Sequence, residues 1–105
     1  TLEFGKRIIR LTKALPKNTI NIELASQVVR SGTSVGANYR EANESLSKKD
    51  FVMRIKICRK EAKETHYWLE LIVEANPQFE SKIKALRDES LELVKIFSAI
   101  LAKSV

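Results

Sequence analysis

Apolar residues recur every three or four positions along most of this chain, a spacing that is typical of amphipathic α-helices. Residues 2–15 form the first predicted helix. Its apolar stripe consists of Phe4, Ile8, Leu11 and Leu15. Pro16 ends this helix, because proline has no N–H to donate and its ring clashes with the preceding turn. Asn18 or Thr19 then suits the N-cap of the next helix.

The second predicted helix, residues 20–42, contains an unusual run of small residues. Its apolar stripe consists of Ile22, Ala25, Val28, Val29, Gly32, Val35 and Tyr39. Gly32 and Gly36 are four positions apart and therefore share one face. A glycine in a helix interior costs about 1 kcal/mol relative to alanine, and it persists where another backbone must come close. The spacing therefore predicts tight helix packing on this face.

Ser47 is the predicted N-cap of a third helix over residues 48–75, and Asp50 adds a favourable negative charge in its first turn. The main apolar stripe of this helix consists of Phe51, Ile55, Cys58, Ala62, Leu69 and Ile72. A neighbouring stripe consists of Ile57, Trp68 and Leu71. So wide an apolar band exceeds what one core requires, and it predicts that the neighbouring stripe is buried between subunits.

Asn76 and Pro77 mark a turn, and proline suits the first position of a fourth helix over residues 77–103. The inward side chains of this helix are expected to be Phe79, Ile83, Leu86, Val94, Phe97 and Leu101. All links between the helices are short, which makes successive helices antiparallel neighbours. The sequence therefore predicts an all-α fold, an antiparallel up-and-down four-helix bundle, as a single domain over residues 1–105.

The net charge of +6 is unevenly distributed. Residues 1–63 hold 14 Lys/Arg and 6 Asp/Glu, whereas residues 64–105 hold 5 and 7. Such an excess is either an ordinary solvated helix surface or a surface that binds a polyanion. The candidate nucleic-acid-binding residues on the first and third helices are Lys6, Arg7, Arg10, Lys13, Lys17, Lys49, Lys56, Arg59, Lys60 and Lys63. No base-reading motif accompanies them, so the predicted contacts are with phosphates.

Candidate enzyme sites are weak. The segment of small residues around Gly32 and Gly36 lacks the Gly-Lys-Ser/Thr ending of a phosphate-binding loop. His66 is the only histidine and follows Glu64 by two positions, whereas a di-iron bundle requires Glu-x-x-His on two helices. Cys58 lies on the core stripe and is expected to be a small buried hydrophobe. No catalytic residue, metal or cofactor is predicted.

The single cysteine favours the cytoplasm, and no apolar run is long enough to span a membrane.

Several polar residues fall on or beside the predicted packing faces. They are Arg30, Asn38, Glu41, Glu61 and Glu64. Buried charges are tolerated when they are paired and hydrogen-bonded. We expect a polar network that fixes the register of the helices, with Arg30 paired to Glu41 or Glu61 within or between subunits, and a binding pocket is the alternative.

Three segments carry a resemblance to a known family: Arg30-Ser-Gly-Thr-Ser-Val-Gly-Ala-Asn-Tyr-Arg-Glu41, Lys49-Asp-Phe51 and Lys60-Glu-Ala-Lys-Glu-Thr-His-Tyr-Trp-Leu69. They resemble the four-helix bundle proteins that include those encoded in intervening sequences of bacterial 23S ribosomal RNA genes. The accessory protein of diversity-generating retroelements is a relative. The resemblance covers nearly the whole chain and implies an up-and-down bundle that assembles as a homopentamer. The retroelement relatives are basic, bind nucleic acid and partner a reverse transcriptase.

Two functional hypotheses follow. The first is a non-enzymatic, ring-forming accessory protein that binds RNA or DNA without strong sequence specificity, with a reverse transcriptase as the partner that the resemblance implies. The second is a structural or protein-interaction oligomer with no role in nucleic-acid binding.

Overall fold

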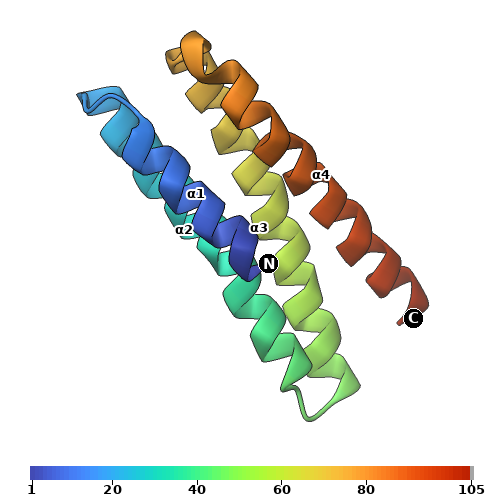
Figure 1. The fold of residues 1–105 in the computed structure, drawn as a ribbon. Coiled ribbons are helices and arrows are strands. Elements are labelled where there is room, and N and C mark those ends of the chain that lie inside the picture. Colours follow the sequence, from blue (N-terminus) through green and yellow to red (C-terminus); the bar gives the residue numbers. More distant parts are fainter. Residues whose placement is uncertain (105) are drawn as a thin grey trace.

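The computed structural model describes residues 1–104, which form four α-helices and one short 3₁₀ turn. The elements are α1 (Leu2–Ala14), α2 (Thr19–Asn43), α3 (Lys48–Ala75), η1 (Pro77–Phe79) and α4 (Glu80–Lys103). They run up and down along a body of 44 × 19 × 19 Å (Figure 1). The predicted all-α, antiparallel four-helix bundle is confirmed.

Local signals set the helix boundaries. The Asn18 side chain accepts a hydrogen bond from the Asn21 N–H at 2.8 Å, and the Ser47 hydroxyl accepts one from the Asp50 N–H at 3.1 Å. Each cap satisfies a backbone donor that has no partner inside the helix. Leu15 is extended rather than helical, because the residue before a proline is disfavoured in the α region. The fourth helix begins three residues later than predicted, since Pro77–Phe79 form the 3₁₀ turn.

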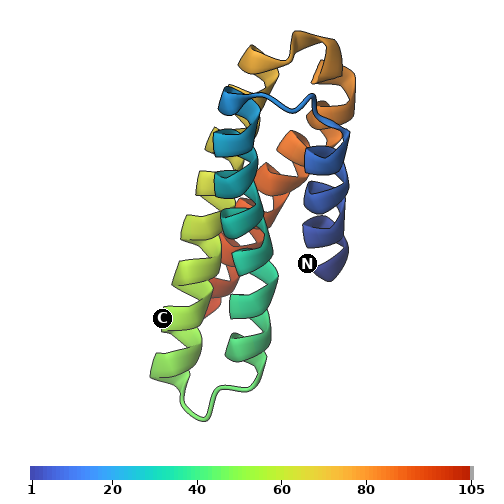
Figure 2. The same cartoon turned by 90° about the vertical axis from the view of Figure 1, so that its left-hand side faces the viewer.

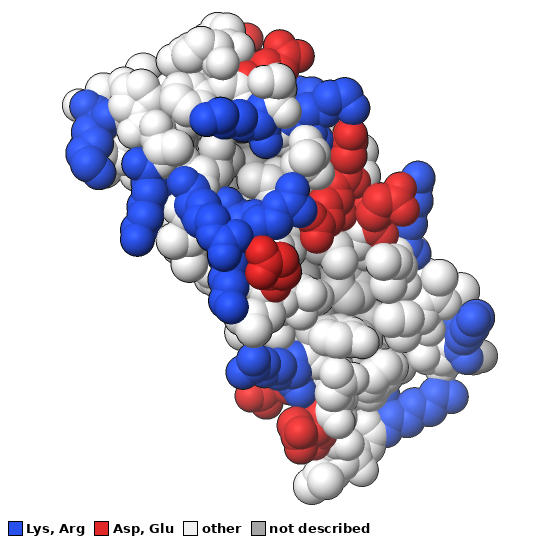
Figure 3. Space-filling model, in the orientation of Figure 1, with Lys and Arg blue, Asp and Glu red and all other residues white. Residues whose placement is uncertain are grey.

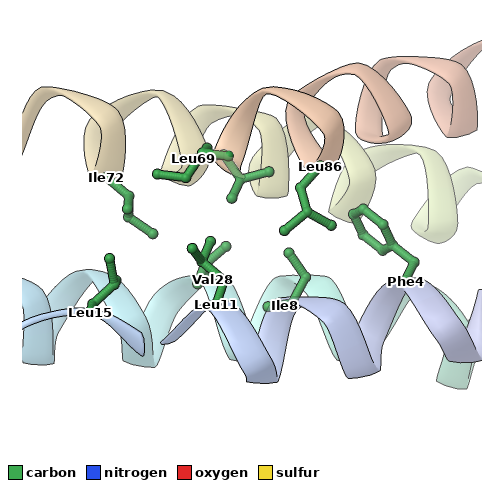
Figure 4. Close-up of a cluster of buried hydrophobic side chains, with 9 residues drawn as sticks. Phe4, Ile8, Leu11, Leu15, Val28, Leu69, Ile72 and Leu86 are labelled. Atoms are coloured by element: carbon green, nitrogen blue, oxygen red, sulfur yellow. The ribbon is translucent and has the colours of Figure 1, made fainter. Parts of the chain in front are cut away.

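Helix α1 is much shorter than the others, and this divides the core into two parts. Where α1 covers the bundle, four helices surround a first cluster of apolar side chains (Figure 4), namely Phe4, Ile8, Leu11, Leu15, Val28, Leu69, Ile72, Ile83 and Leu86. Beyond the N-terminus of α1 only α2, α3 and α4 continue (Figure 2). They enclose a second cluster, which consists of Val35, Ala42, Ile55, Cys58, Ala62, Phe97 and Leu101.

The start of α1 packs against α2 at its two glycines, as their spacing predicted. A Cβ atom built on Gly32 would lie 3.1 Å from Cγ1 of Ile8, and one built on Gly36 would lie 3.6 Å from Thr1. A larger side chain at position 32 would therefore push α1 away from α2. The close approach of the Ile8 side chain is therefore the reason for Gly32.

The predicted core stripe of α2 is wrong at one position. Ile22 is 62% exposed, whereas its neighbour Asn21 is buried. Asn21 and Asn76 exchange two side-chain hydrogen bonds of 2.8 and 2.9 Å, and each also donates to a backbone carbonyl, of Pro16 and Ile72 respectively. This pair ties the start of α2 to the end of α3, and it satisfies both buried amides.

Candidate nucleic-acid interface

Four lysines form a row on the side of α3 that faces away from the core. Lys49, Lys56, Lys60 and Lys63 are exposed and follow one another at intervals of seven, four and three residues, so they share one face of the helix. The opposite face carries the buried residues Ile55, Cys58, Ala62 and Leu69. Arg59 flanks the row and is half-buried. We call these five basic residues the α3 row.

The α3 row lines two adjoining shallow grooves. One, of about 470 Å³, is lined by Lys56, Arg59, Lys60, Lys63, Glu64 and Tyr67. The other, of about 720 Å³, is lined by Ser47, Lys48, Lys49, Asp50, Val52, Met53, Lys56 and Ser104. Lys56 lines both grooves, which adjoin at this residue on the outside of the helix. Their size is that of ordinary ligand sites, but lysines and an arginine dominate the first of them.

The positive charge of the α3 row is not cancelled by neighbouring carboxylates. Within residues 1–104, none of its five members lies in an ion pair. The nearest acidic residues of α3 are held by other arginines. Glu61 and Glu64 pair with Arg30, and Asp50 lies 4.0 Å from Arg54. The row therefore presents unpaired cations to solvent.

The basic residues of α1 are in a different position. Arg7 pairs with Glu89 of α4, and Arg10 pairs with Glu3 at 3.0 Å. The Arg10 guanidinium also lowers the pKa of Glu3 by hydrogen bonding and by its charge. Lys6, Lys13 and Lys17 are exposed. On the face over α1 and α4, Figure 3 shows basic side chains along α1 with acidic side chains beside them.

The two basic sets do not form one surface. Helix α1 packs closely on α2 and α4, whereas over the described residues its backbone stays apart from that of α3, and the two helices share only side chains of the first core cluster. Figure 2 shows α1 and α3 at opposite sides of the bundle. The chain therefore carries two separate basic surfaces, of which the α3 row is the one without paired carboxylates within residues 1–104.

The predicted polar network is only partly assembled. The Arg30 guanidinium donates to Glu61 Oε2 at 3.1 Å and also to Glu64. Glu61 is buried, but the Arg30 side chain is 52% exposed. Hydrogen bonding to Glu64 and the charge of both carboxylates raise the pKa of Arg30, against a smaller opposing effect of desolvation. The Arg30–Glu61 contact therefore lies at the edge of the α2–α3 seam and not inside the core.

Two predicted members lie outside this cluster. Asn38 donates to the Ser34 carbonyl at 2.9 Å and accepts from Arg54 at 3.3 Å, about two turns further along the seam. Glu41 is exposed, and its side chain makes no hydrogen bond or ion pair with residues 1–104. Of the two partners expected for Arg30, Glu61 is the one that it meets and Glu41 is not, because Glu61 and Glu64 occupy the guanidinium.

The three predicted interface residues, Ile57, Trp68 and Leu71, are all half-buried in the subunit. Trp68 packs partly against the first core cluster, and its Nε1 atom is buried without a hydrogen-bond partner in the described part of the chain. The Tyr67 ring meets Trp68 edge-on, with 5.1 Å between the ring centroids. These residues leave apolar surface beside the α3 row.

The candidate reactive groups lie in structural contacts. Cys58 is fully buried, and burial raises the pKa of its thiol to about 11. His66 Nε2 lies 3.5 Å from Glu70, whose carboxylate also meets Arg87 at 3.4 Å. Among residues 1–104, no group of three or more His, Cys, Asp and Glu side chains is placed to hold a metal ion. None of the helices in that range is long and apolar enough to cross a bilayer.

Comparison with known proteins identifies the family. The profile of the 23S rRNA-intervening sequence proteins matches residues 1–99. The chain belongs to this family. The resemblance seen in the sequence is thereby confirmed. Among curated proteins, none matches the chain.

A solved structure agrees with this assignment. The chain is 36% identical to a Bacteroides thetaiotaomicron protein of unknown function from the S23 ribosomal protein family. The match covers 95% of this chain and 93% of that one, with a TM-score of 0.84. Neither description names an enzymatic activity, so the family establishes the fold and leaves the function to be argued from the surface.

Proposed function

We propose that this protein is a homo-oligomeric, non-enzymatic nucleic-acid-binding protein of the cytoplasm. It holds phosphates along the α3 row and does not read base sequence. One observation carries the proposal: five basic side chains lie along the outside of a single helix, and none is paired with a carboxylate of residues 1–104. A basic side chain that meets a phosphate releases condensed counterions, which gives binding without sequence selection.

The α3 row supports this proposal better than the basic residues of α1. Arg7 and Arg10 are already paired with carboxylates of the same chain. A phosphate would have to compete with Glu89 and Glu3 for those guanidinium groups. No carboxylate of residues 1–104 pairs with the lysines of the α3 row, so their charge is available to a partner.

A binding titration tests the proposal. We expect the protein to bind mixed-sequence RNA and DNA at low salt, with affinity that falls steeply toward physiological salt and changes little with base sequence. Replacing Lys56, Lys60 and Lys63 by Glu should abolish binding. The matched control replaces Lys82, Lys95 and Lys103 of α4 by Glu, which changes the net charge equally and should leave most of the affinity.

Failure of the unmodified protein to bind any nucleic acid at low salt would refute the proposal. The protein-interaction oligomer would then be the better account, and the positive charge would serve solubility. Equal loss of binding in the two triple variants would show that net charge matters and that the α3 row does not.

We further propose that subunits assemble into a closed ring, with five copies as the family resemblance implies, through the surface around Ile57, Trp68 and Leu71. The half-buried state of all three residues supports this. A repeated head-to-tail contact satisfies every subunit when it closes into a ring. Light scattering at micromolar concentration should give a multiple of the 12.0 kDa chain mass, and a monomer mass would refute the ring.

A reverse transcriptase is the protein partner that we propose from the resemblance to retroelement accessory proteins. The basic character of this chain, with a net charge of +6, supports that choice, because those relatives are basic too. Co-purification with a reverse transcriptase encoded near the gene tests it. A reverse transcriptase that is present but stays in the unbound fraction at low salt would count against it.

A further inference from the structure

We propose that Tyr67 is a stacking platform for an unpaired base, so that the α3 row binds single-stranded nucleic acid by a contact that a duplex cannot make. The inference rests on the proposed function and adds the class of nucleic acid that the site selects. It begins with the position of Tyr67, one turn beyond Lys63 on the same face of α3. The same groove is lined by both residues.

Tyr67 is a large aromatic residue on the outer face of α3, and 56% of it is exposed. Its ring is supported from one side, since it meets the Trp68 ring edge-on at a centroid distance of 5.1 Å and an interplanar angle of 71°. Trp68 is itself packed against the first core cluster. An aromatic ring that is held in place and still open to solvent loses little conformational entropy when a partner stacks on it.

The charges around Tyr67 suit the backbone of a strand whose base it holds. Lys56, Lys60 and Lys63 precede it by about three, two and one helical turns. One turn brings side chains about 5–6 Å apart, which is close to the distance between successive phosphates of one strand. Glu64, the one acidic residue lining this groove, is held by Arg30 at the α2–α3 seam.

A single strand and a duplex differ in what they offer to this groove. Both present phosphates to the lysines. In a duplex the faces of the bases are covered by their neighbours, and exposing one requires unstacking it. In a single strand every base has a free face, and stacking on an aromatic side chain is the usual way to bind it without sequence preference. Only a single strand therefore uses both parts of the groove at once.

The test compares Tyr67→Leu, Tyr67→Phe and the unmodified protein on single-stranded RNA, single-stranded DNA and the corresponding duplexes. Leucine keeps apolar cover over Trp68 but has no ring. We expect Tyr67→Leu to weaken single-strand binding roughly tenfold and to leave duplex binding within about twofold. Tyr67→Phe should keep the affinity for single strands. The RNA and DNA arms show whether both kinds of strand use the platform.

Trp68 is the only tryptophan of the chain and serves as a second readout. A base that stacks on Tyr67 changes the surroundings of Trp68, so its emission should change on titration with single strands and stay nearly constant with duplexes. Equal effects of Tyr67→Leu on single strands and duplexes, or no effect on either, would overturn the inference. If duplex binding through the lysines persists in that case, the proposed function stands. Absence of all binding would refute both.

Discussion

Arg30 holds two carboxylates of α3 that differ in their exposure to solvent. Glu61 has a side chain only 8% exposed, whereas Glu64 is 38% exposed. Removing the guanidinium leaves the Glu61 carboxylate without its partner in a place that water reaches poorly. Arg30→Met should lower the free energy of unfolding by about 1–2 kcal/mol, between the values for exposed and buried pairs. Urea denaturation measures this change.

Glu41 provides the control for that prediction, because the sequence pattern places it on or beside the same packing face as Arg30. Its side chain is exposed and unpaired within residues 1–104. Glu41→Ala should therefore leave the free energy of unfolding within about 0.5 kcal/mol of the unmodified protein. A loss for Glu41→Ala as large as that for Arg30→Met would show that Arg30 has no special role.

Burial of the Cys58 thiol should make the free energy of unfolding decrease at alkaline pH. Burial raises the pKa of its thiol from 9.0 to about 11 in the folded protein. The folded state therefore binds the thiol proton more tightly than the unfolded state, and this contribution to stability is present in full below pH 9.0. It is lost as the pH rises toward 11, because the unfolded chain ionises first.

Urea denaturation at several pH values measures the effect, with Cys58→Ala as the reference. The two proteins differ only at position 58, so the difference between them isolates the thiol. We expect the stability advantage of the unmodified protein over Cys58→Ala to shrink between pH 9 and 11. A constant difference over this range would show that the thiol is not desolvated.

At the scale of the helices, local sequence determines where each element begins and ends. Pro16, Asn18 and Ser47 act within one turn of their own position, which is why the sequence predicts these boundaries to within a residue or two. Periodicity predicts that Ile22 lies in the core, and this prediction is wrong because burial at the start of α2 depends on Asn76, which is 55 residues away from Asn21. Periodicity alone contains no such information.

Replacing each of the two glycines of α2 by alanine should change the stability in opposite directions. At Gly36 a Cβ atom would be in ordinary contact with Thr1 at 3.6 Å, so Gly36→Ala should stabilise the helix by up to about 1 kcal/mol. At Gly32 it would lie 3.1 Å from Ile8, which is fully buried and stiff at its branched carbon. Gly32→Ala should therefore lose about 1 kcal/mol or more through overpacking.

Thermal and urea denaturation of the two variants measure this difference directly. Because the substitution is the same, the change in helix propensity cancels between them. Equal stabilisation by both would mean that Ile8 moves aside at little cost and that Gly32 is not required by the α1–α2 contact.

At the scale of the whole molecule, the order of the helices around the bundle decides what the basic residues can do together. The sequence predicts which lysines and arginines lie on α1 and α3, because helical periodicity identifies the outer faces. It does not reveal that these helices are diagonal, or that Arg7 meets Glu89 across 82 residues. Only the three-dimensional structure shows that the α3 row is free of ion pairs within residues 1–104 and that the Tyr67 ring rests against Trp68.

Assembly of the subunits should strengthen the binding of a long strand. Each subunit of a ring contributes one α3 row, and linked sites bind a long strand more tightly than a single site through effective concentration alone. Replacing Ile57 and Leu71 by Gln should weaken the subunit contact without changing any charge. We expect the mass to fall to that of smaller species and the affinity for a long strand to fall roughly 100-fold.

Dissociation of the ring should also weaken the salt dependence of binding. Fewer phosphates are then held per particle, so the slope of log affinity against log salt becomes shallower. Leu91→Gln on α4 is the matched control, since Leu91 is 44% exposed and lies outside the proposed contact. Circular dichroism checks that each variant is folded. If the Ile57 and Leu71 variant dissociates yet keeps the affinity and salt slope of the intact protein, one α3 row holds the strand by itself and the ring has another purpose.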